Sequence, residues 1–333
     1  MSFDIPLRNY HTLAVEASCS KLLTICSEQD VYSALVQHEG PFRILGGGSN
    51  VLPSKNIAEV ILLNTIKGIN VIDEDDQTAL VAVGAGEYWH QFVMWTLSHN
   101  LGGLENLSYI PGKVGAAPMQ NIGAYGVEQD HCFHSLKAID LQEGTSKVFY
   151  KDECSFGYRD SIFKNQVKGR YIITQVNYLL SKKHELQISY GAIMDVLSNR
   201  DIVSPTIQDV SDAVIDIRKS KLPDPKVIPN AGSFFKNPII SLEAFNKLQK
   251  LFPDVKYYEV DQSNMKIPAA WLIEQAGLKG VHRNGAGTHK NHALVVVNYD
   301  NATGQQILDL ASEIESTVLA KFDIKLEKEV NIW

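Results

Sequence analysis

The chain has 333 residues, a formal net charge of −7 and 44% hydrophobic side chains, so it is long enough to bury a sizeable core. Its mild acidity argues against nucleic acid as the main partner, because phosphate backbones bind to basic surfaces. No apolar run approaches the roughly 18 residues of a membrane span, the N-terminal residues lack the regions of a signal peptide, and the four cysteines show no CxxC pairing, so we expect a cytoplasmic protein without membrane insertion.

Helices and strands alternate along the first part of the chain. Ser27 and Asp30 resemble a capping box at the start of a helix. We expect helices at 27–39 and 87–99, and strands at 43–45, 57–64, 78–84, 133–141, 147–151 and 170–180. A glycine-punctuated loop at 106–126 interrupts them, and a loop of this length is usually functional.

The pattern changes near 216–226, where charges and two prolines indicate a linker. Beyond it we expect helices at 241–251, 267–276 and 303–322, and strands at 293–298 and 324–332. The chain therefore predicts an α+β protein with three lobes.

Two glycine-rich segments point to an anionic ligand. Gly46-Gly47-Gly48-Ser49-Asn50 follows a strand, and successive glycines let backbone N–H groups converge on a diphosphate. The segment is neither a Walker loop nor a helix-opening dinucleotide motif. The loop at 110–126 can approach a flat ring or a phosphate closely. A plain turn and an irregular loop are the alternatives, but two such segments together favour a cofactor.

Three polar residues are candidates for chemistry, and each has a structural alternative. Arg159 could bind a ligand carboxylate, or form a salt bridge with Asp160 or another acid. Ser233 could protonate a developing carbanion, or close a turn or cap a helix. Glu329 could be catalytic, or belong to a solvated strand face. From the residues alone, the structural alternative is the simpler one in each case.

Two histidine clusters do not predict a metal site. His131 and His134 would point to opposite faces of a strand, and neither they nor His282, His289 and His292 have the paired spacing of a zinc site. We therefore expect no bound metal.

Five segments together resemble the UDP-N-acetylenolpyruvoylglucosamine reductases, and their order and spacing extend over almost the whole chain. They are ILGGGSNVL, IPGKVGAAPMQNIGAYG, FGYRDSIFK, IRKSKLPDP and NAGSFFKNP, followed by Glu329. The resemblance implies reduction of the enolpyruvyl ether of UDP-N-acetylglucosamine to UDP-N-acetylmuramate, with NADPH as co-substrate and non-covalently bound FAD. It places this reaction in peptidoglycan synthesis in the bacterial cytosol, and so in cell wall biogenesis, cell shape, cell division and the cell cycle.

The resemblance also implies roles for individual residues. Hydride would pass from the flavin N5 to C3 of the substrate and a proton from Ser233 to C2, while Arg159 and Glu329 polarise the carboxylate. Tyr190, in QISYGAI, resembles the phosphate-contacting tyrosine of the type I branch, and Arg218, Lys221 and Asn237 would also bind substrate. Flavin contacts are expected at Leu45, Gly46, Gly47, Gly48, Ser49, Asn50, Ile110, Pro111, Gly112, Gly115, Ala116, Asn121, Ile122, Gly123 and Tyr125.

The chain departs from the family pattern at two places. Ala116 and Ala117 stand where some members carry hydroxyl side chains, and His292 stands where the type I pattern has a polar amide. A hydroxyl contact to the flavin N5 would therefore be missing here.

The implied fold is an FAD-binding domain of the vanillyl-alcohol-oxidase type plus a C-terminal α+β substrate domain. We expect FAD-binding subdomains at 1–67 and 68–217, a substrate-binding domain at 218–322, and a strand at 323–333 that returns to the flavin-binding region. Two other functions stay open. A flavin oxidase of the same fold, acting on a sugar or lactone, would reduce oxygen and ignore NADPH, and a non-catalytic sugar-nucleotide-binding protein would be colourless.

Overall fold

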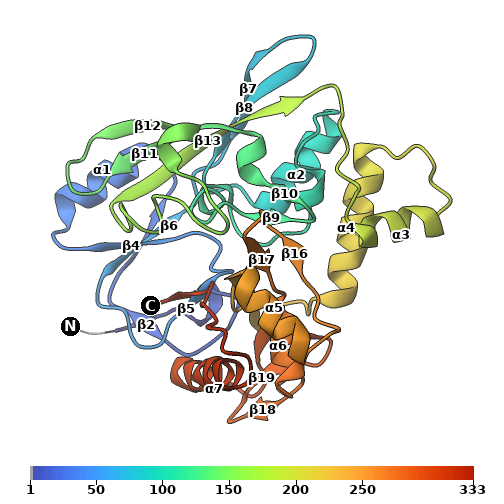
Figure 1. The fold of residues 1–333 in the computed structure, drawn as a ribbon. Helices are drawn as coiled ribbons and strands as arrows, with labels where there is room; N and C mark the ends of the chain where they lie inside the picture. The colour runs from blue at the N-terminus through green and yellow to red at the C-terminus, as the bar shows by residue number, and fades with distance from the viewer. Residues whose placement is uncertain (1–2) are drawn as a thin grey trace. The chain divides into compact units, whose positions relative to one another are not determined.

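The computed structural model describes residues 3–333, which divide into two compact units. Unit 1 comprises residues 19–47 and 58–220, and unit 2 comprises residues 3–18, 48–57 and 221–333. Figure 1 labels most of the helices and strands of both units. Each unit is therefore assembled from segments that are distant in the sequence.

A small parallel sheet begins unit 1. Its strands lie in the order β3 (Leu22–Ile25), β6 (Val60–Asn64), β4 (Phe42–Leu45). Helix α1 (Glu28–Gln37) starts at the predicted capping box and packs Val31 and Ala34 against Ile25 and Leu62. Because the strands are parallel, the carboxyl ends of β4 and β6 lie at the same edge of the sheet.

The larger sheet of unit 1 is antiparallel and has five strands. Its order is β12 (Ser146–Tyr150), β11 (Phe133–Asp140), β13 (Tyr171–Ser181), β8 (Thr78–Gly84), β7 (Ile69–Glu74). Helix α2 (Trp89–Ser98) buries Trp89 and Phe92 against Tyr178 of β13. The predicted strands and this helix are confirmed within about two residues, and β7 is an additional edge strand.

The connections between these strands contain short elements. They are the 3-10 helices η2 (Glu105–Leu107), η3 (Val114–Ala116), η4 (Gln129–His131) and η5 (Lys151–Cys154), and the hairpin of β9 (Gly123–Ala124) and β10 (Val127–Glu128). The long loop predicted at 106–126 is thus a series of tight turns.

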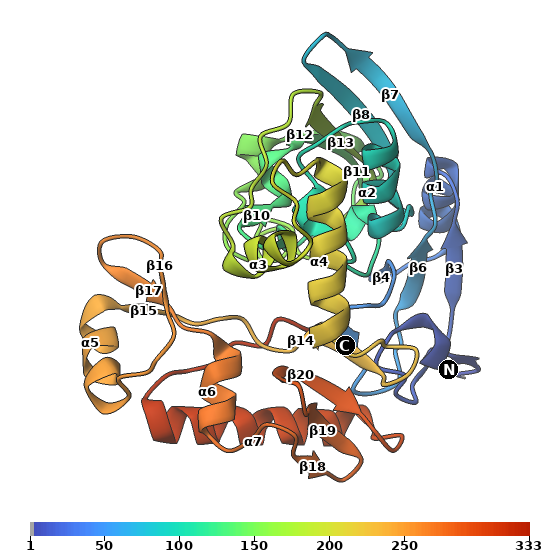
Figure 2. The ribbon, with the colours of Figure 1, turned by 90° about the vertical axis from the view of Figure 1, so that its right-hand side faces the viewer.

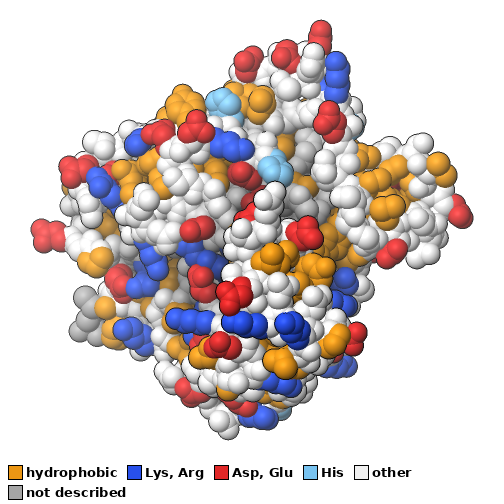
Figure 3. Space-filling view, viewed as in Figure 1, with side chains coloured by type: hydrophobic (Ala, Val, Ile, Leu, Met, Phe, Trp, Pro, Cys, Tyr) orange, Lys and Arg blue, Asp and Glu red, His pale blue; other side chains and the backbone are white. Residues whose placement is uncertain are grey.

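Helices α3 (Gly191–Asn199) and α4 (Ile207–Lys221) share a small apolar core, and Figure 2 shows them beside each other. Apolar side chains are exposed in this region, including Met194 of α3 (50% exposed) and Val203 in the connection to α4 (93% exposed). Figure 3 shows hydrophobic side chains on the surface of this part of the molecule. The linker predicted at 216–226 is wrong in its first part, because α4 continues to Lys221. The apolar residues of α4 recur at helical spacing, and this stabilises the helix despite its charged end.

A four-stranded antiparallel sheet forms the centre of unit 2. Its order is β14 (Asn230–Ser233), β20 (His292–Asn298), β19 (Ala286–His289), β18 (His282–Arg283). A second small sheet contains β15 (Ile239–Ser241), β17 (Asn264–Lys266) and β16 (Tyr258–Glu259). The helices are α5 (Leu242–Leu251), α6 (Ala269–Gln275) and α7 (Gly304–Phe322), all close to their predicted ranges.

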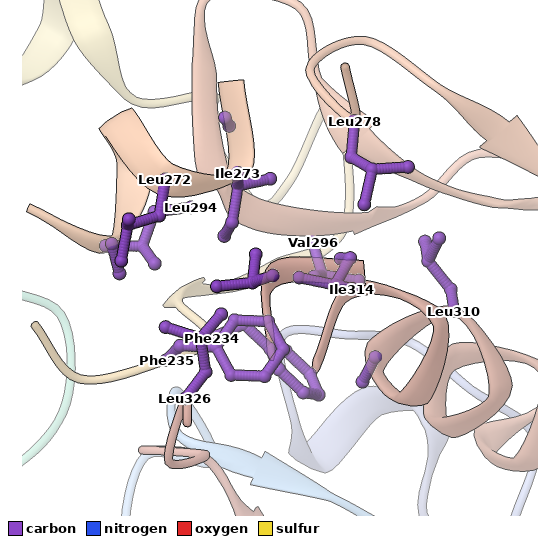
Figure 4. Close-up of a cluster of buried hydrophobic side chains, with 14 of the residues drawn as sticks. Phe234, Phe235, Leu272, Ile273, Leu278, Leu294, Val296, Leu310, Ile314 and Leu326 are labelled. Atoms are coloured by element: carbon purple, nitrogen blue, oxygen red, sulfur yellow. The ribbon is translucent and has the colours of Figure 1, made fainter. Parts of the chain in front are cut away.

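Segments from both ends of the chain complete unit 2. β1 (Ile5–Pro6) and the 3-10 helix η1 (Arg8–Tyr10) lie in the N-terminal segment, and β2 (Ser18–Cys19) spans the division between the units. β5 (Val51–Leu52) pairs in parallel with β21 (Asn331–Ile332). The hydrophobic core gathers side chains of α6, α7 and β20 around Phe234 and Phe235 (Figure 4).

The strand predicted at 324–332 is mostly wrong, because only Asn331–Ile332 forms a strand. The expected alternation nevertheless holds locally, since Ile324 and Leu326 are buried and Glu327 is exposed. This segment meets residues 234–236 through only two backbone hydrogen bonds and has no longer ladder. Side-chain alternation alone therefore does not make it a strand.

The observed division is coarser than the predicted one. The boundary predicted after residue 217 lies inside α4, near the division at Ser220, whereas residues on both sides of the boundary predicted after 67 belong to unit 1. Residues 323–333 group with 221–322. The three-lobe division stays a prediction.

Among the helices of residues 3–333, none has the length and apolar character needed to cross a membrane.

Candidate active site

The two predicted glycine segments meet in unit 1. Gly46 and Gly47 follow β4, and a Cβ atom on Gly47 would lie 3.0 Å from the Cα of Gly112. Gly112 itself has a φ of +113°, which favours glycine. The loop that begins at Ile110 therefore packs backbone against backbone on the Gly46–Gly47 turn.

The second half of the first glycine segment lies in unit 2. Gly48 has a φ of +64°, and a Cβ there would clash with the Tyr10 carbonyl oxygen at 2.0 Å. The Thr12 N–H donates to the Gly48 oxygen at 3.1 Å. Next to it, the Thr12 hydroxyl and both His11 ring nitrogens are buried without hydrogen-bond partners. Because an unsatisfied buried polar group costs about 1–3 kcal/mol, this region fits a site that a polar ligand completes.

Asn121, an expected flavin contact, is occupied in shaping the loop. Its φ is +43°, and its side-chain amide donates to Glu128 Oε2 at 2.8 Å while its oxygen accepts from the Asp130 N–H at 3.2 Å. The side chain is buried. In unit 1, the Asn121 side chain therefore shapes the loop that begins at Ile110, and its carbonyl oxygen accepts from Arg159 Nη1 at 3.5 Å.

Arg159 is held by the same loop. Its Nη2 donates to the Gly123 carbonyl oxygen, and its Nη1 lies 3.6 Å from Glu128 Oε1. The side chain is 18% exposed, and the residue has a φ of +54°, a strained conformation that clusters at functional sites. Asp160 instead accepts from Asn165 and from the Ser161 N–H. The ion pair with Glu128 therefore agrees with the structural alternative of a salt bridge with another acid, and a role for Arg159 at a ligand carboxylate stays a prediction.

Tyr190 and Arg218 come together with Tyr125 in unit 1. The Tyr125 and Tyr190 rings meet edge to face with centroids 5.2 Å apart, and the charge of Arg218 acts on the Tyr125 phenol. Arg218 Nε also donates to the Tyr109 carbonyl oxygen at 3.0 Å. Burial lowers the pKa of Arg218, and the charge of Arg159 lowers it further by a smaller amount.

No acid balances this buried guanidinium, since Arg218 forms no ion pair within residues 3–333. A buried charge without a counter-charge is expensive. The cluster of Arg218 with the two tyrosines is therefore suited to an anionic ligand.

Backbone pairing places Ser233 and Glu329 close together in unit 2. The Phe234 N–H donates to Leu294 of β20 at 2.9 Å, and the Glu329 N–H donates to the Phe234 oxygen at 2.9 Å. Buried Phe234 and Phe235 anchor the segment. Ser233 ends a strand, and its hydroxyl makes no hydrogen bond within residues 3–333. The helix-cap and turn alternatives for Ser233 are therefore wrong.

Further polar residues of the expected site lie in unit 2. His292 lies across from His289, and the Nδ1 atoms of both rings are buried without a partner. Burial, followed by the nearby charge of Lys221, lowers the pKa of His292. Asn237 accepts a hydrogen bond from the Ala269 N–H at 2.9 Å, which leaves its amide donors for other contacts. In this part of unit 2, burial favours the uncharged form of the His289 and His292 rings, and His292 lies near the charge of Lys221.

The expected site residues thus form two groups. Arg159, Tyr190 and Arg218 belong to unit 1, whereas Ser233 and Glu329 belong to unit 2 together with Lys221 and Asn237. Sequence reasoning did not single out Glu128, Tyr109 or Lys113, because nothing in their local patterns marks them. In residues 3–333, His, Cys, Asp and Glu side chains form no group of three that could hold a metal ion.

Comparison with known proteins gives matches over the whole chain. Residues 24–149 match the family model of an FAD binding domain, and residues 224–333 match the C-terminal domain of UDP-N-acetylenolpyruvoylglucosamine reductase. The reductase of Flavobacterium johnsoniae is 49% identical, covering 99% of this chain and 98% of that one. The reductase of Pseudomonas aeruginosa is 42% identical, covering 98% and 97%.

Solved structures confirm the fold class. The reductase of Thermus caldophilus matches with a TM-score of 0.70 at 24% identity, covering 99% of this chain and 97% of that one. A solvent-stable cholesterol oxidase matches with a TM-score of 0.50 at 11% identity, covering 97% and 86%. The protein combines an oxidase-type FAD-binding domain with a reductase C-terminal domain. From the identity and coverage of its relatives, the chain belongs to the UDP-N-acetylenolpyruvoylglucosamine reductase family of oxidoreductases.

Proposed function

We propose that this chain reduces the enolpyruvyl ether of UDP-N-acetylglucosamine to UDP-N-acetylmuramate, using NADPH and non-covalently bound FAD, in cytoplasmic peptidoglycan synthesis. Family membership and the FAD-binding domain support the reaction class. The observation that carries the proposal is the available hydroxyl of Ser233, which strand pairing holds beside the Glu329 backbone. Such an arrangement suits proton delivery by a side chain that makes no competing hydrogen bond.

The residues present fit FAD. Backbone N–H groups at Gly46, Gly47 and Gly48 would hold its diphosphate, and the turns from Ile110 to Gly123 would contact the ring system. The orphaned polar atoms of His11 and Thr12 beside Gly48 are further evidence for a polar ligand there. When bound, FAD supplies the hydride that reaches C3 of the substrate.

Arg159 and Glu329 act on the substrate carboxylate in this proposal. Hydride arrival at C3 develops negative charge at C2, which spreads into the adjacent carboxylate. The Arg159 guanidinium is oriented in advance by the Gly123 carbonyl, so it needs little reorganisation as this charge grows. A preorganised donor of this kind stabilises a transition state by about 3–4 kcal/mol.

Ser233 then delivers the proton to C2. The pKa of a serine hydroxyl is far too high for it to protonate an unactivated carbon, so its task depends on the charge at C2. A positioned general acid contributes roughly 10²–10⁴-fold to the rate.

Two groups of residues bind the rest of the substrate. Tyr190 and Arg218 offer a phenol and a buried guanidinium, and Lys221 and Asn237 offer an ammonium and an amide. All four suit the anionic diphosphate and the sugar of a UDP-sugar. The type I assignment rests on Tyr190, in the segment that precedes α3.

The experiment is the visible spectrum of the purified full-length protein. The protein should be yellow, acid precipitation should release all its flavin into the supernatant, and NADPH should bleach the flavin absorbance. Rapid reoxidation by oxygen with no response to NADPH would favour a sugar or lactone oxidase. A colourless protein that binds UDP-sugar would leave only a binding function, and colour that stays with the pellet would refute non-covalent binding.

A further inference from the structure

Lys113 is a buried lysine for which the mechanism above has no task. The residue is 7% exposed, and its Nζ donates to the Asn64 carbonyl oxygen at 2.6 Å. The same Nζ lies 5.8 Å from the centroid of the Tyr88 ring. Within residues 3–333 no carboxylate forms an ion pair with it. The Lys113 ammonium therefore contacts a carbonyl oxygen and lies near an aromatic ring, and neither carries the negative charge that would balance it.

The nearest acid is already paired. Glu87 forms an ion pair at 3.0 Å with Lys67, which lies over the same Tyr88 ring at 5.0 Å. Burial, followed by the charge of Lys67, lowers the pKa of Lys113, and Glu87 raises it only in part. Because Glu87 is paired with Lys67, it offsets the charge of Lys113 only in part. Holding such a charge is costly unless a ligand supplies the opposite one.

The position of Lys113 indicates which ligand that is. Asn64 ends β6 and Gly46 follows β4, so both lie at the carboxyl edge of the parallel sheet. A Cβ on Gly46 would lie 3.8 Å from the Lys113 Cβ. Ligands of sheets with parallel strands bind outside this edge. The Lys113 side chain therefore runs from the glycine turn to the end of the neighbouring strand.

Backbone N–H groups alone give the glycine turn only partial positive charges. A diphosphate carries full negative charges, and a nearby ammonium is the type of group that balances them. We propose that Lys113 provides the counter-charge for the diphosphate of bound FAD and so positions the cofactor. This inference rests on the proposed FAD-dependent function.

The test compares three flavins on the full-length protein freed of flavin. FAD and FMN carry phosphate, whereas riboflavin carries only the ring and the ribityl chain. Binding is followed through flavin fluorescence. Lys113→Met should weaken FAD binding about 10- to 100-fold, in line with loss of a charge-assisted contact, and should also weaken FMN binding. Riboflavin binding should not change.

Matched variants separate charge from structure. Lys113→Gln keeps a donor for the Asn64 carbonyl but removes the charge, so it should lose FAD affinity like Lys113→Met, and it carries the test if the methionine variant does not fold. Lys113→Arg should retain most of the affinity. The control is the double substitution Lys67→Met with Glu87→Gln, which removes the neighbouring ion pair as a whole and should leave all three affinities unchanged.

Two results would overturn the inference. Equal losses for FAD and riboflavin would show that Lys113 is a structural cap of the Asn64 carbonyl, and unchanged FAD affinity in both Lys113→Met and Lys113→Gln would show that its charge does not reach the cofactor. Failure of the unsubstituted protein to bind any flavin would instead refute the proposed function, and with it this inference.

Discussion

Ser233 is positioned by its neighbours, while its own side chain is left available. The Phe234 N–H donates a hydrogen bond to Leu294 of β20, and the Phe234 carbonyl oxygen accepts one from the Glu329 N–H. The side chains of Phe234 and Phe235 are fully buried. Replacing the hydroxyl should therefore leave the local fold intact. This makes Ser233 a clean position at which to separate the two half-reactions.

Ser233→Ala should affect only the second half-reaction. FAD should still bind, and NADPH should bleach it at a near-normal rate, whereas reoxidation by the enolpyruvyl substrate should slow by at least about 10²-fold through loss of the positioned acid. Ser233→Cys should restore part of the rate, since a thiol also donates a proton. Anaerobic stopped-flow absorbance measures both steps. Equal slowing of both, or of neither, would make Ser233 a structural residue.

His11 should give the protein a distinct pH dependence. Burial lowers its pKa from 6.5 to about 4, with a smaller contribution from Arg8, and the Val15 backbone and Glu16 oppose the shift. Between these values the unfolded chain binds a proton that the folded chain does not, so stability falls as pH falls from 6.5 towards 4.

Urea unfolding at pH 7 and pH 5 measures this effect. Between these two pH values the unsubstituted protein should lose about 2 kcal/mol more stability than His11→Leu, which has no titrating group there. Equal losses in the two proteins would show that His11 is protonated in the folded state.

The sequence predicts which residues are candidates for the site. It does not predict the contacts that position their side chains. Arg159 stands in a recognisable segment, yet its partners Gly123 and Glu128 lie more than 30 positions earlier and become neighbours only through the turn at β9 and β10. Lys113 gives no sequence signal, because a lysine in a loop is ordinarily solvated. Its importance follows from burial, which depends on the sheet edge against which it packs.

At the scale of elements, α7 shows how local chemistry defines a helix. Its N-cap Thr303 accepts from the Gln306 N–H at 3.2 Å, and the Gln306 side chain accepts from the Thr303 N–H at 2.8 Å. The buried face then carries Ile307, Leu310 and Ile314 into the core. Both capping and packing therefore stabilise this helix.

Thr303→Ala should lower the free energy of unfolding by about 1 kcal/mol, because one N-terminal N–H loses its acceptor. Chemical denaturation of the full-length protein measures this. Ser312→Ala in the middle of the same helix is the control, since its hydroxyl only bonds back to Leu308, and its change should stay within about 0.5 kcal/mol. An equal effect of both substitutions would show that the cap contributes nothing specific.

Helices with regularly spaced apolar residues could be predicted from the sequence. Elements stabilised by contacts with distant parts of the chain could not. Helices α1 and α7 combine caps with regular apolar spacing, so their sequence limits them closely. The last turn of α4 is charged, so the sequence predicts a linker where the helix in fact continues. The segment at 324–330 alternates like a strand, but it finds partners only at residues 234–236 and therefore stays irregular.

At the scale of the whole molecule, the units are built from distant segments. In unit 2, the Asn50 side chain donates to the Glu329 carbonyl oxygen across 279 positions, and β5 pairs with β21. No local pattern predicts such pairing, because its partners become adjacent only after the intervening chain has folded. The resemblance to the family predicts the domain types, whereas the grouping of segments into units depends on contacts between residues that are distant in the sequence.

The most direct test of the account is a single turnover without oxygen. The flavin of the full-length protein is first reduced by stoichiometric NADPH, and the enolpyruvyl UDP-sugar is then added while absorbance and product mass are followed together. We expect oxidised flavin absorbance to return as the UDP-sugar gains two hydrogen atoms, in equal amounts. Flavin that stays reduced, or that is reoxidised without hydrogenated product, would contradict it.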